Sequence, residues 1–175
     1  CRSKARFDIW ANNPYTSGSP YHKSNGKSDV SLNRLAEVGR VLQAAKKSKK
    51  IIIPRSQKVR FWVTEFSWDS NGPDPNGVPM NDLVRWIPEA MYMSWKAGVT
   101  NFLWLSMRDW QTDSLTNGVT IESGLYYRGA VPEQDVAKPT LAAFRFPFVA
   151  YRRSSGIEVW GRTPSSQPGF VKIYY

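Results

Sequence analysis

Three strand patterns, each followed by a helical pattern, constrain the fold more than any other feature of this sequence. Apolar patterning predicts six elements in the order strand, helix, strand, helix, strand, helix: 7–10, about 29–45, 59–64, about 81–97, 101–105 and 139–146. Strands that alternate with helices form parallel β-α-β units, whose crossovers are right-handed and whose strands are buried on both faces. The sequence therefore predicts an α/β fold, and both a doubly wound sheet and a barrel satisfy the pattern.

Cap residues predict where the helices begin and end. Asp29 is expected to cap the first helix, Gly98 to end the second and Pro139 to open the third. Pro88 interrupts the second helical pattern, because proline lacks an N–H group and its ring clashes with the preceding turn, at a cost of about 3 kcal/mol. We expect either a kink at Pro88 or a helix that begins later.

The pattern changes to a period of two after Val149. The runs 157–160 and 170–174 flank a loop rich in Gly, Pro and Ser, and they predict a β-hairpin. We therefore expect two parts: residues 1–148 form an α/β domain, and residues 149–175 begin a β-rich appendage.

Composition excludes several classes of protein. With 175 residues, 41% of them hydrophobic, the chain is long enough and apolar enough for a globular core. Cys1 and His22 are the only cysteine and histidine, so a Cys/His zinc site is excluded, and we expect no metal and no cofactor. No run of about 18 apolar residues occurs, so we expect no membrane span. The first residue is not Met and no signal peptide is visible, so we treat the chain as a fragment.

The formal charge of +10 would suit an anionic partner such as nucleic acid. However, the densest basic run, 46–50, falls at the end of a predicted helix, where cations complement the helix dipole and face water. We favour a solvated face over a nucleic-acid patch. The nucleic-acid alternative, which would also use Arg152 and Arg153, predicts a steep loss of binding with salt.

Polar segments follow the three predicted strands. They lie at 11–16, 65–70 and 106–110, and each belongs to a long loop, which is uncommon in a compact domain unless the loop has a function. In a parallel α/β fold these strand ends form the face on which loops place functional side chains. We therefore expect the candidate site at this face.

These segments resemble a known enzyme class. Asn-Pro-Tyr-Thr at 13–16, Trp-Val-Thr-Glu-Phe-Ser-Trp-Asp at 62–69 and Trp-Leu-Ser-Met-Arg-Asp at 104–109 resemble the ends of strands six, seven and eight of clan A retaining glycoside hydrolases. They are especially similar to actinobacterial cellulase-like proteins. Further similar segments are 18–22, 73–79, 123–126 and 138–150. The resemblance implies a partial TIM (β/α)8 barrel, made of strands six to eight with their helices, followed by a β-rich C-terminal appendage.

The resemblance assigns the catalytic roles. It implies that Glu65 is the nucleophile that attacks the anomeric carbon, and that Tyr15 donates a hydrogen bond to it. The alternative for Glu65 is a solvated acid just past a strand, and for Tyr15 an ordinary packed tyrosine.

The other residues assigned to substrate binding follow the same strands: Asn13, His22, Trp68, Arg108, Asp109 and Trp110. Asn13 stands where related clan members often carry histidine, and His22 is either a sugar contact or an incidental loop residue. Trp68 and Trp110 are either sugar platforms or core, whereas Trp104, inside a strand, is expected in the core.

Arg108 and Asp109 are either a sugar-binding or site-orienting pair or a structural ion pair, since opposite charges directly after a buried strand must find partners. The sequence leaves both alternatives open.

The second acid of a retaining mechanism is not expected in this chain. In the clan it lies in an Asn-Glu pair at the end of strand four, and a complete barrel takes about 250 residues, so the resemblance implies a missing N-terminal barrel half as partner. The expected function is retaining hydrolysis of a β-linked oligo- or polysaccharide by an extracellular parent protein. A noncatalytic carbohydrate-binding protein is the alternative.

Overall fold

A computed structural model describes residues 3–24, 26, 28–54, 58–71, 74–110, 121–165, 167 and 169–174. Cys1 lies outside the described residues. The helices are η1 Leu32–Arg34, α1 Leu35–Lys47, α2 Met80–Lys96, η3 Pro132–Gln134 and α3 Pro139–Arg145. The strands are β1 Ala5–Arg6, β2 Ile9–Asn12, β3 Ile51–Ile52, β4 Arg60–Phe66, β5 Val99–Trp104, β6 Tyr126–Tyr127, β7 Val136–Ala137, β8 Phe148–Arg153 and β9 Gly156–Gly161.

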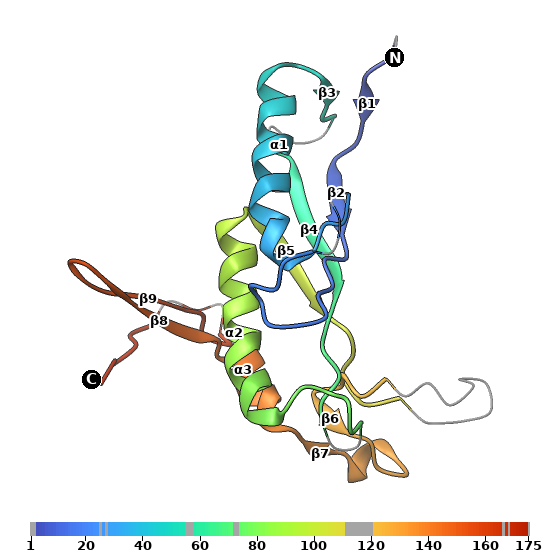
Figure 1. Ribbon diagram of the computed structural model, residues 1–175, viewed down its shortest axis with the longest axis vertical. Helices are drawn as coiled ribbons and strands as arrows, with labels where there is room; N and C mark the ends of the chain where they lie inside the picture. Colours follow the sequence, from blue (N-terminus) through green and yellow to red (C-terminus); the bar gives the residue numbers. More distant parts are fainter. Residues whose placement is uncertain are drawn as a thin grey trace.

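A three-stranded parallel sheet lies at the centre, in the order β2-β4-β5 (Figure 1). Its register pairs Ala11 with Trp62, and Trp62 with Asn101. The short strands β1 and β3 form a second parallel pair. The predicted α/β class and the parallel arrangement of the three main strands are therefore confirmed, with strand β4 in the middle.

The core lies between this sheet and the helices α1 and α2, which stand on one side of it (Figure 1). Strand β4 turns Phe61, Val63 and Phe66 toward the helices, and all three are buried. Their partners include leucine, isoleucine and alanine side chains of the helical layer: Leu32, Leu35, Leu42, Leu83, Ile87 and Ala90. Burying one such apolar side chain contributes roughly 1.5–3 kcal/mol, so this layer holds β4 firmly in place.

The other face of the sheet is less well covered. Successive side chains of a strand point to opposite faces, so Trp62 and Thr64 lie opposite Phe61 and Val63, and both are only partly buried. On β5, Leu103 is exposed. The expectation that these strands are buried on both faces is therefore wrong for the described part of the chain, because both long helices pack on the same side. An all-parallel sheet normally has both faces covered.

Two helix starts differ from the sequence predictions. The first helical segment begins with η1 and then α1, whose N-cap is Arg34, and Asp29 caps neither element. Helix α2 begins at Met80 and continues through Pro88, so the alternative of a later start is wrong. Pro88, Leu83 and Ile87 are all buried, and this packing offsets the hydrogen bond that proline cannot make.

Two predicted helix boundaries are confirmed. Gly98 follows the C-cap of α2 with a φ of 88°, a left-handed conformation that favours glycine. Pro139 stands at the first position of α3.

The C-terminal hairpin pairs different strands from those predicted. Strand β9 pairs antiparallel with β8, so the run 157–160 lies beside 148–153, and 170–174 contains no strand. A two-residue connection, Ser154 and Ser155, joins β8 to β9, whereas a partner at 170–174 would need a longer loop. The hairpin packs on α2, where the ring of Tyr92 lies 5.2 Å from Tyr151 and 5.7 Å from Trp160. The division into two parts at residue 148 stays a prediction.

Candidate functional site

Glu65 lies near the carboxyl end of β4, the middle strand, and its side chain is exposed. Tyr15, in the loop after β2, donates its hydroxyl to Glu65 Oε2 at 3.4 Å. The ring of Tyr15 stacks on Phe66, with 6.0 Å between centroids and 23° between planes. The structure therefore brings together the two residues predicted to be catalytic, and the buried Phe66 supports both of them.

Asn13 ties the ends of β2 and β4 together. Thr64 Oγ1 donates to Asn13 Oδ1 at 2.7 Å, one residue before Glu65. The amide oxygen of Asn13 can accept one further hydrogen bond and its NH₂ group can donate two, so both ends of the amide can bond a substrate hydroxyl.

The pKa of Tyr15 is raised, first because the hydroxyl is partly removed from water and second because the charge of Glu65 opposes ionisation. A hydrogen bond with Ser67 acts in the opposite direction, and Asp69 adds a smaller increase. Tyr15 therefore keeps its proton at neutral pH and acts as a donor toward Glu65.

A polar hollow of about 370 Å³ opens beside Tyr15. Its lining is mostly hydroxyl and charged side chains: Tyr15, Thr16, Ser17, His22, Lys23, Ser24, Asp29 and Ser31. His22 is exposed, its Nε2 lies 3.3 Å from Ser17 Oγ, and its imidazole lies so close to Gly18 that a Cβ added there would meet Nδ1 at 2.7 Å. The structure thus places His22 and Tyr15 on one hollow, and Glu65 stands next to it rather than in its lining.

Trp68 is a core residue. It is 6% exposed, its ring meets Phe66 edge-on at 4.6 Å, and its Nε1 donates to Gly18 O at 3.0 Å. The core alternative therefore describes Trp68, which anchors the loop that carries Tyr15 and His22. Trp104 is partly buried and also packs on Phe66, as expected. Trp110 is 47% exposed, and its role as a sugar platform stays a prediction.

Arg108 and Asp109 turn to different partners. Arg108 Nη2 donates to Asp135 Oδ1 at 2.5 Å and to Gly129 O at 3.2 Å. Partial burial acts to raise the pKa of Asp135, but the hydrogen bonds from Gly129 and Arg108 outweigh it, and the pKa is lowered. Asp109 pairs with Lys138. The structural alternative, with two separate ion pairs, accounts for these contacts.

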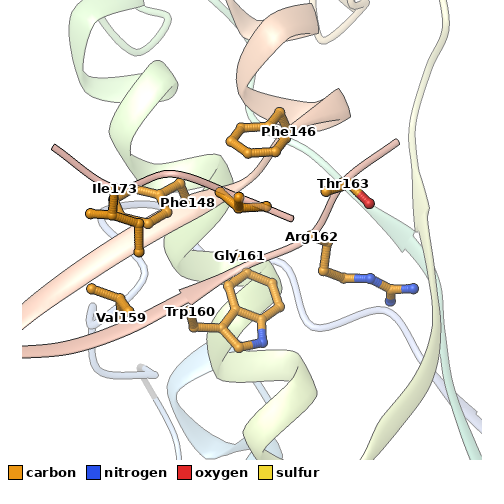
Figure 2. Close-up of a pocket in the computed structure, with 9 residues that line it drawn as sticks. Phe146, Phe148, Val159, Trp160, Gly161, Arg162, Thr163 and Ile173 are labelled. Carbon is orange, nitrogen blue, oxygen red and sulfur yellow. The ribbon is translucent and has the colours of Figure 1, made fainter. Parts of the chain in front are cut away.

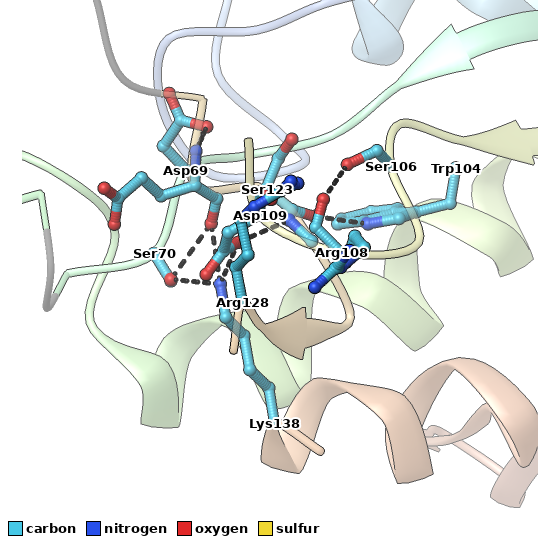
Figure 3. Close-up of polar contacts among 11 residues, drawn as sticks. Asp69, Ser70, Trp104, Ser106, Arg108, Asp109, Ser123, Arg128 and Lys138 are labelled. Atoms are coloured by element: carbon cyan, nitrogen blue, oxygen red, sulfur yellow. Dashed lines mark hydrogen bonds and ion pairs between the residues drawn. The ribbon is translucent and has the colours of Figure 1, made fainter. Parts of the chain in front are cut away.

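Lys138 was not predicted from the sequence as a site residue. Among the described residues, its side chain is the most deeply buried of the charged ones. Its Nζ donates to Ser70 Oγ at 2.9 Å, to Asp109 Oδ1 at 2.6 Å and to Glu122 O at 2.9 Å (Figure 3). This ammonium joins the loop after β4, the loop after β5 and the start of α3. The only sequence signal for it was that Asp109, directly after a strand, needed a partner.

Two acids beside Lys138 have raised pKa values. For Asp69, burial is the main cause, and the N–H of Glu122, which donates to Asp69 Oδ1 at 3.0 Å, works against it. For Glu122, burial is again the main cause and the charge of Asp109 adds to it. Burial therefore favours the neutral form of both carboxyl groups more than water does.

An apolar hollow of about 140 Å³ lies on the C-terminal hairpin, apart from the strand ends (Figure 2). Phe146, Phe148, Val159 and Ile173 contribute its apolar lining. The basic run 46–50 lies at the end of α1 and beyond it, largely exposed.

Among the described residues, no group of three or more His, Cys, Asp or Glu side chains could hold a metal ion. In the same part of the chain, no helix combines the length and the apolar character needed to cross a membrane. Comparison of the chain with protein-family models, with curated proteins and with solved structures gave no match.

Proposed function

We propose that this chain is part of a (β/α)8 barrel, in the position of strands six to eight. The support is the incomplete sheet: three parallel strands carry α1 and α2 on one face, while on the opposite face Trp62 is only partly buried and Leu103 is exposed. In a barrel this second face becomes the packed interior, which would bury these side chains. The partner is then the N-terminal half of the same barrel.

We further propose that the completed barrel hydrolyses β-linked glycans with retention of configuration, and that Glu65 is the nucleophile. The observation that carries this proposal is the Tyr15–Glu65 hydrogen bond at the carboxyl end of the middle strand. Active sites of (β/α)8 enzymes lie on this face. A carboxylate that is exposed, anchored on a strand and paired with a neutral hydroxyl donor suits nucleophilic attack.

The chemistry divides between this chain and its partner. Glu65 attacks the anomeric carbon, the glycosidic bond breaks, and the leaving oxygen takes a proton from an acid on the other half, about 5 Å from Glu65. Water then attacks the anomeric carbon and gives a proton to the same group on the other half, which now acts as a base, and the bond to Glu65 breaks. Tyr15 donates a hydrogen bond to the carboxylate, and in this proposal Asn13 and His22 contact the sugar.

A noncatalytic carbohydrate-binding function is the second candidate. The hollow beside Tyr15 favours the noncatalytic function, because His22 and several hydroxyl groups line this hollow and Glu65 does not. Such a lining can bind a sugar without any reaction.

The two candidates differ in whether the complete barrel releases a product from a β-glycan. If it is the hydrolase, NMR should show that the first product is the β-anomer. Glu65→Gln should then abolish product release and leave glycan binding intact. Glu37→Gln, an exposed acid on α1, serves as the matched control and keeps full activity. Glycan binding with no product from the wild type would favour the noncatalytic function, and inverted product would reject the assigned mechanism.

A further inference from the structure

Basic side chains gather at the end of the molecule opposite the candidate site. The last turn of α1 lies at this end together with β1 and β3, whereas β6 and β7 lie at the other end (Figure 1). Residues 38–60 contain eight Lys or Arg and no Asp or Glu, so they supply most of the formal charge of +10. The segments at and beyond the ends of β4 and β5, 65–79 and 105–138, contain eight Asp or Glu and three Lys or Arg. Cations are therefore in excess at one end of the chain and acids at the other.

Strand pairing brings a second basic segment beside the run 46–50. Strand β1 pairs in parallel with β3, and Ala5 lies opposite Ile51. The residues just before these two, Lys4 and Lys50, are therefore neighbours, since paired strands lie about 4.8 Å apart. We define the basic end as six side chains: Lys4, Arg6, Lys46, Lys47, Lys49 and Lys50. All but Lys46 are exposed, and within the described ranges none of the six forms an ion pair.

Lys49 occupies a backbone conformation that favours glycine. Its φ is 56°, and it directly follows Ser48, the C-cap of α1. At the matching position of α2, directly after the C-cap Ala97, the chain has Gly98. A side chain in this left-handed region costs stability relative to glycine. The chain thus keeps a positive charge where glycine would be more stable, and such strain points to a function.

The helix dipole does not account for all of these cations. The negative end of a helix attracts cations only within its last turn, and the last turn of α1 already holds Lys46 and Lys47. The other members of the basic end lie beyond the helix or beside β3 on β1. Neighbouring members repel each other, because their spacing is below the Debye length of about 8 Å at physiological salt. A bound polyanion would remove this repulsion.

We propose that the basic end binds a polysaccharide with repeated carboxylate groups and so anchors the protein at a distance from its strand ends. Lysine ammonium groups are point charges on flexible stems, and they suit the spaced carboxylates of a polyuronate better than a planar, bidentate ligand. The choice of a glycan among polyanions rests on the proposed function. The excess of acids around Glu65 repels the same polymer, so the polyuronate is an anchor and not the substrate.

The composition of the basic end disfavours a single-stranded nucleic acid. Such strands bind to aromatic side chains on which their bases stack, in addition to cations. The segments 3–6 and 38–58 contain no Phe, Trp, Tyr or His. The surface also stays accessible in a completed barrel, because the helices form the outer ring of that fold.

Isothermal titration calorimetry of the full chain with oligogalacturonate tests the proposal. We expect binding that weakens at least about tenfold between 50 and 200 mM salt, because the lysines release the counterions of the polymer. A neutral β-glucan oligosaccharide should not displace the oligogalacturonate. Binding is measured without any cleavage, so a failure of the glycosidase proposal leaves this result intact, and the reverse also holds.

Two triple variants separate the basic end from the net charge of the chain. Replacing Lys47, Lys49 and Lys50 by Gln should weaken binding at low salt about tenfold or more. The matched control replaces Arg145, Arg152 and Lys172 by Gln, which removes the same charge from exposed positions on α3, β8 and the C-terminal segment. The control should keep its affinity, and equal losses in both variants would overturn the proposal.

Lys49→Gly tests the strained position by itself. Glycine relieves the left-handed conformation, so this variant should have a higher melting temperature and, at the same time, a lower affinity for oligogalacturonate. A higher melting temperature with unchanged affinity would contradict the role given to Lys49. Duplex DNA that binds the full chain more tightly than oligogalacturonate would overturn the proposal in favour of a nucleic-acid partner, and binding of neither polymer would overturn it as well.

Discussion

Phe66 connects the core to the strand end, and replacing it by alanine tests that connection. Its fully buried ring lies within 4.6–6.3 Å of the rings of Tyr15, Trp68, Phe102 and Trp104. Burial of a phenylalanine side chain contributes roughly 1.5–3 kcal/mol, and aromatic pairs add about 0.5–1.5 kcal/mol. With the cavity that remains, Phe66→Ala should lower the free energy of unfolding by about 3–5 kcal/mol.

Urea denaturation followed by tryptophan fluorescence measures this loss. The midpoint should fall while the slope with urea stays the same, because the surface exposed on unfolding hardly changes. Phe170→Ala is the matched control: Phe170 is fully exposed, so its removal should leave the midpoint within error. A loss below about 1 kcal/mol for Phe66→Ala, or equal losses for both variants, would refute the packing described for this strand end.

Two further predictions concern a close backbone approach at Gly124 and the partly buried hydroxyl of Tyr151. Gly124→Ala should lower the melting temperature clearly, because a Cβ at Gly124 would lie 2.2 Å from the backbone nitrogen of Asp109. Gly26→Ala is the control and should leave the melting temperature unchanged, because Gly26 faces open space. Equal melting temperatures of the two variants would contradict this prediction. Burial, then hydrogen bonds with Tyr21 and Glu89, raise the pKa of Tyr151 above the ordinary 10.0, so the folded chain holds this proton more tightly than the unfolded chain does. The associated stability is present below pH 10 and is lost as the pH rises further, so Tyr151→Phe should reduce the alkaline loss of stability in urea titrations. An unchanged alkaline slope would show that Tyr151 ionises normally.

The order of elements was predictable because each helix carries its apolar residues on one side. The apolar stripe from Leu32 to Leu42 and the paired residues Leu83 and Ile87 face the sheet, and the strand β4 alternates between buried and exposed positions. Local signals such as Gly98 and Pro139 act within one turn of a helix, so they were also reliable.

The errors arose where the outcome depends on competition between distant segments. The run 157–160 could pair with the segment before it, 148–153, or with the segment after it, 170–174. It pairs with 148–153, to which the connection is shorter. Pro88 looked like a helix breaker, but packing of α2 against the sheet outweighs its local cost.

The candidate site was predictable only where residues follow the strands directly. Tyr15 and Glu65 meet because parallel strands end at the same edge of the sheet. Lys138 comes from a distant segment, and no local pattern marks a lysine that will be buried. Trp68 was ambiguous for a similar reason, since the same indole suits a core and a sugar platform equally well.

The central claim is that Glu65 is the nucleophile of a glycosidase, and covalent trapping tests it most directly. The complete barrel is incubated with 2-deoxy-2-fluoro β-glycosides, which stop a retaining enzyme at the glycosyl-enzyme stage, and the labelled peptide is sequenced by mass spectrometry. The proposal predicts one fluorosugar per chain, attached to Glu65. A label on another carboxylate, or an enzyme that hydrolyses β-glycans without ever becoming labelled, would contradict it.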